Sequence, residues 1–77
     1  MTPPSVAAAT IALTINGEPR SLDAGTTIAG LLALHDLDAR LVVVERNGLI
    51  ERDREAFPLT ALADGDLIEL VHFVGGG

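Results

Sequence analysis

The run DGDLIELVHF, residues 64–73, decides the fold of this chain. It opens with an Asp-Gly turn signal and continues as a strand rich in large apolar side chains. Because a strand of this kind is best buried by neighbours on both of its edges, we expect it in the middle of a sheet. The rest of the chain must supply the flanking strands and a covering layer.

A hairpin occupies the first ordered part of the chain. In IALTING (11–17), apolar residues alternate with small or polar ones, which predicts a half-buried strand. Asn16-Gly17 favours a type I′ turn, in which both central residues need positive φ. A second strand, at about Glu18 to Leu22, should pair back antiparallel, and Pro19 places it at the sheet edge because proline cannot donate a ladder bond.

A single helix follows the hairpin. Thr26 or Thr27 can cap it, and we expect it to run to about His35 or Asp36. Its apolar positions have helical spacing and form one face: Ile28, Leu31, Leu32 and, as a candidate fourth member, His35.

A second hairpin lies in LVVVERNGLIER (41–52), with its β-branched strand at 42–44 and a turn at Asn47-Gly48. The stretch 53–65 is irregular or holds one helical turn. We expect Phe57 and Leu59 from this stretch to fill the core.

The element order is β-β-α-β-β-β. One helix has one apolar face, so it should pack across one face of a single mixed sheet of about five strands, with the last strand central and parallel to the first. This is the α+β architecture of the β-grasp, or ubiquitin-like, fold. The predicted organisation is a flexible N-terminal arm (1–9), a β-grasp domain (10–74) and a flexible tail (75–77).

The sheet face away from the helix should be open. Alternation puts Glu69 of the last strand on that face, since an unpaired Glu is seldom buried, and puts Leu67, Val71 and Phe73 with it. The inward set is then Ile68 and Leu70, with His72 as a candidate. In the strand at 41–45 the same reasoning puts Leu41, Val43 and Glu45 on the open face and turns Val42 and Val44 inward. Scattered exposed apolar residues are normal, but these lie beside the tail and predict a partner-docking patch: Val43, Val71, Phe73 and Val74.

Composition limits the classes of partner. The formal net charge is −6, from 11 acidic residues against 5 Arg and no Lys, which argues against nucleic acid and anionic membranes and favours a partner with a basic surface. The absence of Cys excludes disulfides and thiol chemistry on this chain. The first ten residues do not resemble a signal peptide and no stretch approaches a membrane span, so a cytoplasmic location is the default expectation.

Catalytic and metal-site patterns are weak. His35 and His72 are far apart in sequence, without a carboxylate at metal-ligand spacing, and are interpreted as a helix-end residue and a strand residue beside the tail. Asp64-Gly65-Asp66 is interpreted as a turn rather than a cation site, and the acids are expected to be spread evenly over the surface. We therefore expect no catalytic residue, no metal and no bound cofactor.

Three consecutive glycines, Gly75, Gly76 and Gly77, follow the last strand. Backbone without Cβ can thread a channel too narrow for side chains and adopt any φ there. The reactive group would be the α-carboxylate of Gly77, which must be activated, most simply by adenylation from ATP, before sulfur or an amine displaces AMP. Because the chain has no thiol, any sulfur it transports would reside on that carboxylate.

From about residue 10 to Gly77 the chain resembles the thiamine-biosynthesis sulfur carrier family. The resemblance rests on INGE, TTIAGLLALHDL, VVVERNGLIER and above all LADGDLIELVHFVGGG. It departs from the family pattern at Glu51, where Pro is frequent, and at Phe57, where a larger aromatic is frequent. The resemblance implies that a ubiquitin-activating-like enzyme adenylates Gly77, that a sulfur donor protein supplies the sulfur of a thiocarboxylate, and that thiazole synthase accepts it.

Three alternatives stay open at this point. Related carriers that feed molybdopterin synthase share the fold and the terminal Gly-Gly. A ubiquitin-like modifier ligated to other proteins would use the same activated carboxylate. The third alternative is a plain interaction domain, in which the tail is inert and the carboxylate is never activated.

Overall fold

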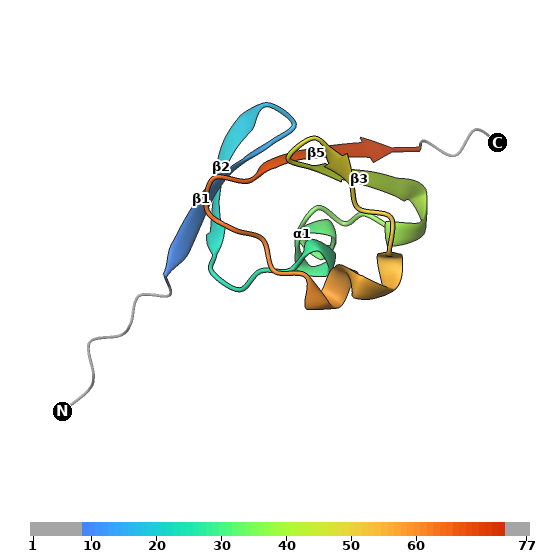
Figure 1. The fold of residues 1–77 in the computed structure, drawn as a ribbon, viewed down its shortest axis with the longest axis horizontal. Helices are drawn as coiled ribbons and strands as arrows, with labels where there is room; N and C mark the ends of the chain where they lie inside the picture. The colour runs from blue at the N-terminus through green and yellow to red at the C-terminus, as the bar shows by residue number, and fades with distance from the viewer. Residues whose placement is uncertain (1–8, 74–77) are drawn as a thin grey trace.

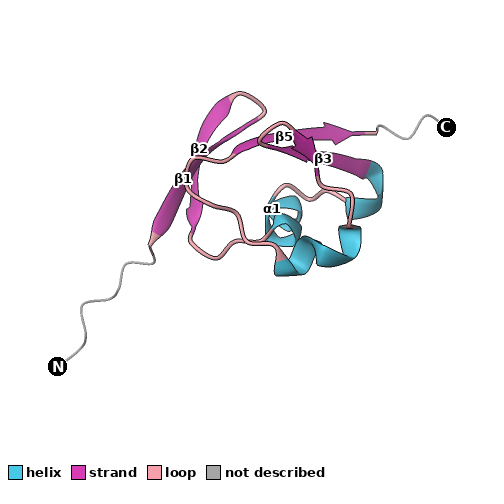
Figure 2. Ribbon diagram, in the orientation of Figure 1, coloured by secondary structure: helices cyan, strands magenta, loops and turns pink. Residues whose placement is uncertain are grey.

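The computed structural model describes residues 9–73, which form a five-stranded sheet with the helical segments on one side (Figures 1 and 2). Predictions for residues 1–8 and 74–77 lie outside the described residues. The elements are β1 (Thr10–Ile15), β2 (Glu18–Asp23), α1 (Ile28–Leu34), the 3₁₀ turn η1 (Ala39–Leu41), β3 (Val42–Arg46), β4 (Leu49–Ile50), the 3₁₀ turn η2 (Arg54–Leu59) and β5 (Leu67–His72).

The strand order is β2-β1-β5-β3-β4, so β5 is central as predicted. It runs parallel to β1, with Ile15 beside Ile68, and antiparallel to β3, with Val44 opposite Leu70. β2, which contains Pro19, is an edge strand. One main helix on one face of this mixed sheet confirms the β-grasp prediction.

Two Asn-Gly turns set the registers of the hairpins. Asn16 and Gly17 have φ of 50° and 80°, and Asn47 and Gly48 have φ of 53° and 84°, the left-handed values that a type I′ turn requires. Each Asn side chain also binds the central strand: Oδ1 of Asn16 accepts from the Leu70 N–H at 2.7 Å, and Oδ1 of Asn47 accepts from the Leu67 N–H at 2.8 Å. The turns therefore hold β5 from both sides.

The helix begins and ends with specific caps. Thr27 is the N-cap, and its hydroxyl accepts from the Gly30 N–H at 3.0 Å. At the other end Asp36 takes a positive φ of 57°, while the Leu37 N–H donates to the Leu32 carbonyl, the 6→1 bond of a Schellman motif. This motif stops the helix at Leu34, so His35 is the exposed C-cap and the prediction that it joins the apolar face was wrong.

The core lies between α1 and the sheet. Phe57 is buried as predicted, but Leu59 is 85% exposed, which corrects the prediction that both fill the core. A 3₁₀ turn has three residues per turn, so residues two apart point in different directions. Leu62 takes the inner position instead, because its N–H bonds the Thr26 carbonyl at 2.9 Å and draws the chain against the start of α1.

No helix within residues 9–73 is long and apolar enough to cross a membrane.

Candidate functional site

The sheet face opposite α1 is the candidate site. Figure 2 shows α1, η1 and η2 on one side of the sheet and none on the other. Leu67, Val71 and Phe73 are each more than half exposed on this face, and Val43 is half-buried. The predicted inward residues Ile68, Val42 and Val44 are buried, and Leu70 is half-buried.

Strand register brings the predicted docking residues together. Val43 is directly opposite Val71 in the β3–β5 pair. The ladder continues one step beyond β5, since the Phe73 N–H donates to the Leu41 carbonyl at 2.8 Å. Leu41 and Phe73 are both exposed, so the patch reaches the last described residue. Val74 and the predicted tail residues Gly75, Gly76 and Gly77 lie outside the described residues.

A pair of carboxylates lies on the same open face of the sheet. Glu45 is directly opposite Glu69, one step of the alternation away from Val43 and Val71. Like charges directly across two strands repel, and neither Glu forms an ion pair with another described residue. Sequence reasoning placed both residues on the open face but missed their juxtaposition, which only the register reveals. A cationic group from a partner would relieve this repulsion.

Asp66 is the one acidic residue that the structure buries among residues 9–73, with 5% exposure. The prediction that the acids are spread evenly over the surface is therefore wrong here, although Asp64-Gly65 does form the predicted turn, with a Gly65 φ of 86°. One oxygen accepts from Arg46 Nε at 2.9 Å and from the Ala63 N–H at 2.8 Å, and the other accepts from Asn47 Nδ2 at 2.9 Å.

These contacts decide the ionisation of Asp66. Burial by itself raises the pKa of this carboxyl, but the hydrogen bonds from Ala63 and Asn47 and the charge of Arg46 outweigh it, so the pKa is lowered from its usual value. An ionised Asp66 thus joins the β3–β4 turn to the start of β5. The residues that it contacts belong to the fold itself, so its role is structural.

The two histidines are separated in the fold as in the sequence. His35 caps α1, whereas His72 ends β5, opposite Val42. Register places His72 on the helix side of the sheet with Leu70, as the alternation predicted, although its side chain is exposed. Among residues 9–73 no group of three His, Asp or Glu side chains could hold a metal ion.

Comparisons with known proteins point to one family. The model of the family described as "ThiS family" matches residues 13–77. The sulfur carrier protein ThiS of Bacillus subtilis (strain 168) is 49% identical over 51 residues, which cover 66% of this chain and 76% of that protein. A crystal structure of the thiamine biosynthesis protein ThiS from Geobacter metallireducens is 40% identical with a TM-score of 0.67, covering 87% of this chain and 100% of that one.

Longer relatives carry a similar segment. Thiazole synthase of Magnetococcus marinus is 43% identical over 63 residues, which cover 82% of this chain and 19% of the relative. Thiazole synthase of Paramagnetospirillum magneticum is 43% identical over 65 residues, which cover 84% and 20%. The chain therefore spans about a fifth of the length of these two relatives. Since the family model covers most of the chain and shorter relatives match over most of their length, this chain belongs to the ThiS family.

Proposed function

We propose that this chain is a sulfur carrier of thiamine biosynthesis and that the sulfur is carried on the α-carboxylate of Gly77. The observation that carries the proposal is the family match, which continues through the last glycine of the sequence. The Bacillus subtilis relative is named a sulfur carrier, and the Geobacter neighbour is named for thiamine biosynthesis. These names favour thiamine over molybdopterin synthesis.

The chemistry proceeds in three steps. A carboxylate oxygen of Gly77 attacks the α-phosphorus of ATP, forming an acyl-adenylate and releasing pyrophosphate. A sulfur nucleophile at the oxidation level of sulfide attacks the carbonyl carbon, the bond from carbon to the AMP oxygen breaks, and a thiocarboxylate and AMP remain. The thiocarboxylate then gives its sulfur to the acceptor, and hydrolysis regenerates the carboxylate with no net redox change.

This sequence of steps requires enzymes other than the carrier, which serves as their co-substrate. ATP is used by an adenylating enzyme of the ubiquitin-activating type, and a donor protein provides the sulfur. Thiazole synthase is the proposed acceptor. Two proteins of that name contain a segment that is 43% identical to this chain. The presence of both in one polypeptide supports a direct interaction between the carrier and thiazole synthase.

The fold supports the role of carrier by fixing the strand that precedes the glycines. β5 is bonded on both edges, and Asn16 and Asn47 add side-chain bonds to it. Phe73, which follows β5 and is the last described residue of the chain, lies beside Leu41 on the open face. A partner that covers the docking patch Val43, Val71 and Phe73 would therefore receive the following residues at a defined position.

Mass spectrometry of the intact protein from cells tests the proposal. We expect a minor species that is heavier by the difference between one sulfur and one oxygen atom, localised to Gly77. Deletion of Gly77 should abolish that species and thiamine-dependent growth, whereas normal growth of the deletion strain would contradict the proposal. Stable binding to a molybdopterin synthase subunit would instead support a carrier for molybdopterin synthesis. High-mass conjugates in cell extracts would support a ubiquitin-like modifier.

A further inference from the structure

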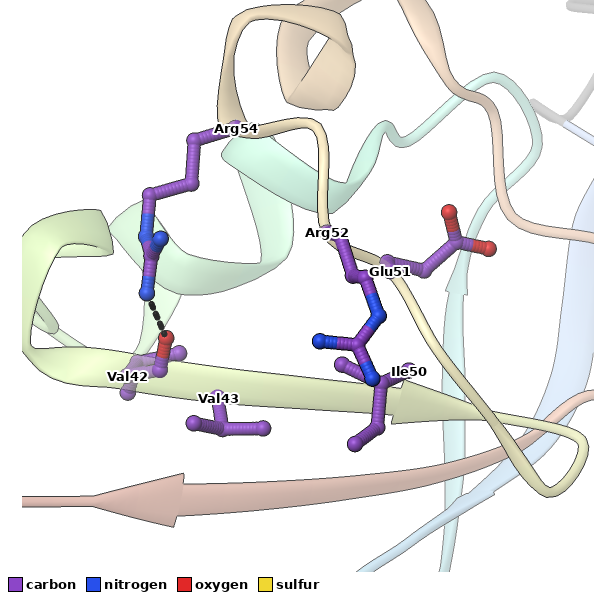
Figure 3. Close-up of a pocket in the computed structure, with 6 residues that line it drawn as sticks. All are labelled: Val42, Val43, Ile50, Glu51, Arg52 and Arg54. Atoms are coloured by element: carbon purple, nitrogen blue, oxygen red, sulfur yellow. Dashed lines mark hydrogen bonds between the residues drawn. The ribbon is translucent and has the colours of Figure 1, made fainter.

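A pocket of about 270 Å³ lies beside the outer edge of β3 (Figure 3). It is lined by Val42, Val43, Ile50, Glu51, Arg52 and Arg54. Figure 3 shows the two guanidinium groups reaching from η2 and the preceding segment towards β3, while the Glu51 carboxylate points away from them.

The pocket exists because β4 is short. It has two residues and pairs only with Glu45 and Arg46, and one further bond joins the Glu51 N–H to the Val44 carbonyl. At Val42 the outer edge of β3, opposite β5, pairs with no strand of residues 9–73. Arg54 spans this gap, since its Nε donates to the Ala39 carbonyl at 2.9 Å and its Nη2 to the Val42 carbonyl at 3.4 Å. These bonds hold one guanidinium in place and leave most of its N–H donors without a partner among residues 9–73.

Charge pairing singles out this pocket. Of the five arginines, Arg20 pairs with Glu18, Arg40 with Asp38 and Arg46 with Asp66. The remaining two, Arg52 and Arg54, form no ion pair with any described residue, and both line the same pocket. In a chain of net charge −6, the two guanidinium groups that have no ion partner among residues 9–73 thus lie at one place.

The surroundings indicate which anion fits. An arginine fork matches a carboxylate with two parallel hydrogen bonds. The other walls include the aliphatic residues Val43 and Ile50, which suit the methylene stem of an acidic side chain better than a fully hydrated ion. Val43 also belongs to the docking patch, so a protein that covers the patch reaches the pocket.

We propose that Arg52 and Arg54 receive a Glu or Asp carboxylate of the enzyme that docks on the open face. This inference rests on the proposed function and refines the expectation of a partner with a basic surface. The partner would place a carboxylate over the Arg52–Arg54 pocket and a cation over the Glu45–Glu69 pair, with an apolar contact at Val43 and Val71 between them. Opposite charges at two separate points would fix the orientation of docking.

The first arm of the test asks whether the pocket takes a carboxylate. Glutarate and, separately, inorganic phosphate are titrated into the isotopically labelled chain, and the side-chain Nε–H signals of arginine are followed by NMR. We expect glutarate to shift the signals of Arg52 and Arg54 with saturation, and to leave the ion-paired Arg20 unmoved. Equal movement of all arginines, or saturation by phosphate alone, would contradict a carboxylate site.

The second arm asks whether the carboxylate comes from the enzyme. Affinity for the adenylating enzyme and for thiazole synthase is measured by calorimetry for the wild-type chain, Arg52→Gln, Arg54→Gln and the control Arg20→Gln. Loss of one desolvated charge pair should weaken binding to one of the enzymes about tenfold or more, with a change below about twofold for Arg20→Gln. Arg52 forms no ion pair with another of residues 9–73, so Arg52→Gln should keep the wild-type melting temperature. In a charge exchange, Arg52→Glu is combined with replacement of the contacting Asp or Glu of the affected enzyme by Arg. This combination should restore the affinity that Arg52→Glu alone removes.

The outcomes separate the two proposals. Normal wild-type binding that is insensitive to Arg52 and Arg54 overturns the carboxylate site and leaves the carrier function standing. Wild-type chain that binds neither enzyme and forms no thiocarboxylate overturns both.

Discussion

Val43 and Val71 face each other across β3 and β5 on the side of the sheet that α1 leaves uncovered. On the same face, two residues further along each strand towards the glycines, the Phe73 N–H donates to the Leu41 carbonyl at 2.8 Å. Two residues away in the other direction, Glu45 pairs with Glu69. The docking patch is therefore bounded at one end by the two Glu residues, and its other end immediately precedes the residues that carry the proposed chemistry. The first prediction concerns Phe73, at this second end.

Phe73→Glu should weaken binding to the adenylating enzyme by about tenfold or more, because a charge replaces apolar area at a contact. The matched control is Leu59→Glu, since Leu59 is also exposed but lies in η2, on the helix side of the sheet. Both variants should keep the wild-type melting temperature. Equal losses of affinity for the two variants, measured by calorimetry, would remove the docking patch.

Asp66→Asn should lower the free energy of unfolding at pH 7 by about 1–3 kcal/mol, because it leaves Arg46 half-buried without its carboxylate. The folded-state pKa of Asp66 is lowered, so its stabilisation is present above the unfolded-state pKa, near 3.8, and is lost as the pH falls through the lower folded-state value. The wild-type and variant unfolding energies should therefore converge at acid pH. Urea titrations across this range measure the difference.

Asp36→Asn is the matched control for the Asp-to-Asn substitution at pH 7. Asp36 is exposed and forms no ion pair within residues 9–73, and Asn tolerates its positive φ. Its unfolding energy should stay within about 0.5 kcal/mol of the wild-type value at pH 7. A loss for Asp66→Asn no larger than this would show that the buried ion pair does not stabilise the fold.

Asn16→Ala should cost more stability than Asn16→Asp. Alanine tolerates the φ of 50° poorly and leaves the Leu70 N–H without the Oδ1 acceptor, for a combined loss of about 1–3 kcal/mol. Aspartate keeps both an acceptor and tolerance of positive φ. Thermal unfolding of the two variants gives the comparison, and equal losses would show that the side-chain bond to β5 contributes nothing.

Leu62→Ala should destabilise the fold by about 2–5 kcal/mol, as expected for truncation of a buried Leu. Leu59→Ala, the same substitution at an exposed site three residues earlier, should change stability by about 0.5 kcal/mol or less. Chemical denaturation distinguishes the two. The reverse order of losses would mean that the core is closed by Leu59, as the sequence suggested.

Sequence alone determined the features that depend on near neighbours. The Asn-Gly pairs require positive φ and so define two hairpins, the alternation in β1 and β5 defines their buried faces, and the Thr27 cap defines the start of α1. The length and number of these elements leave few ways to bury their apolar faces, and this is why the strand order and the central place of β5 were predictable. The glycine tail, and with it the proposed carrier chemistry, was also visible in the sequence.

Tertiary structure decided the features that depend on residues far apart in the chain. The burial of Asp66 follows from Arg46 and Asn47, about twenty positions earlier, and the choice of Leu62 over Leu59 follows from a backbone bond to Thr26. Glu45 meets Glu69 only through the register of β3 and β5, and the pocket of Arg52 and Arg54 opens only because β4 stops at Ile50. Local propensity carries no information on such pairings, because their energies arise from contacts that form only when the whole sheet is assembled.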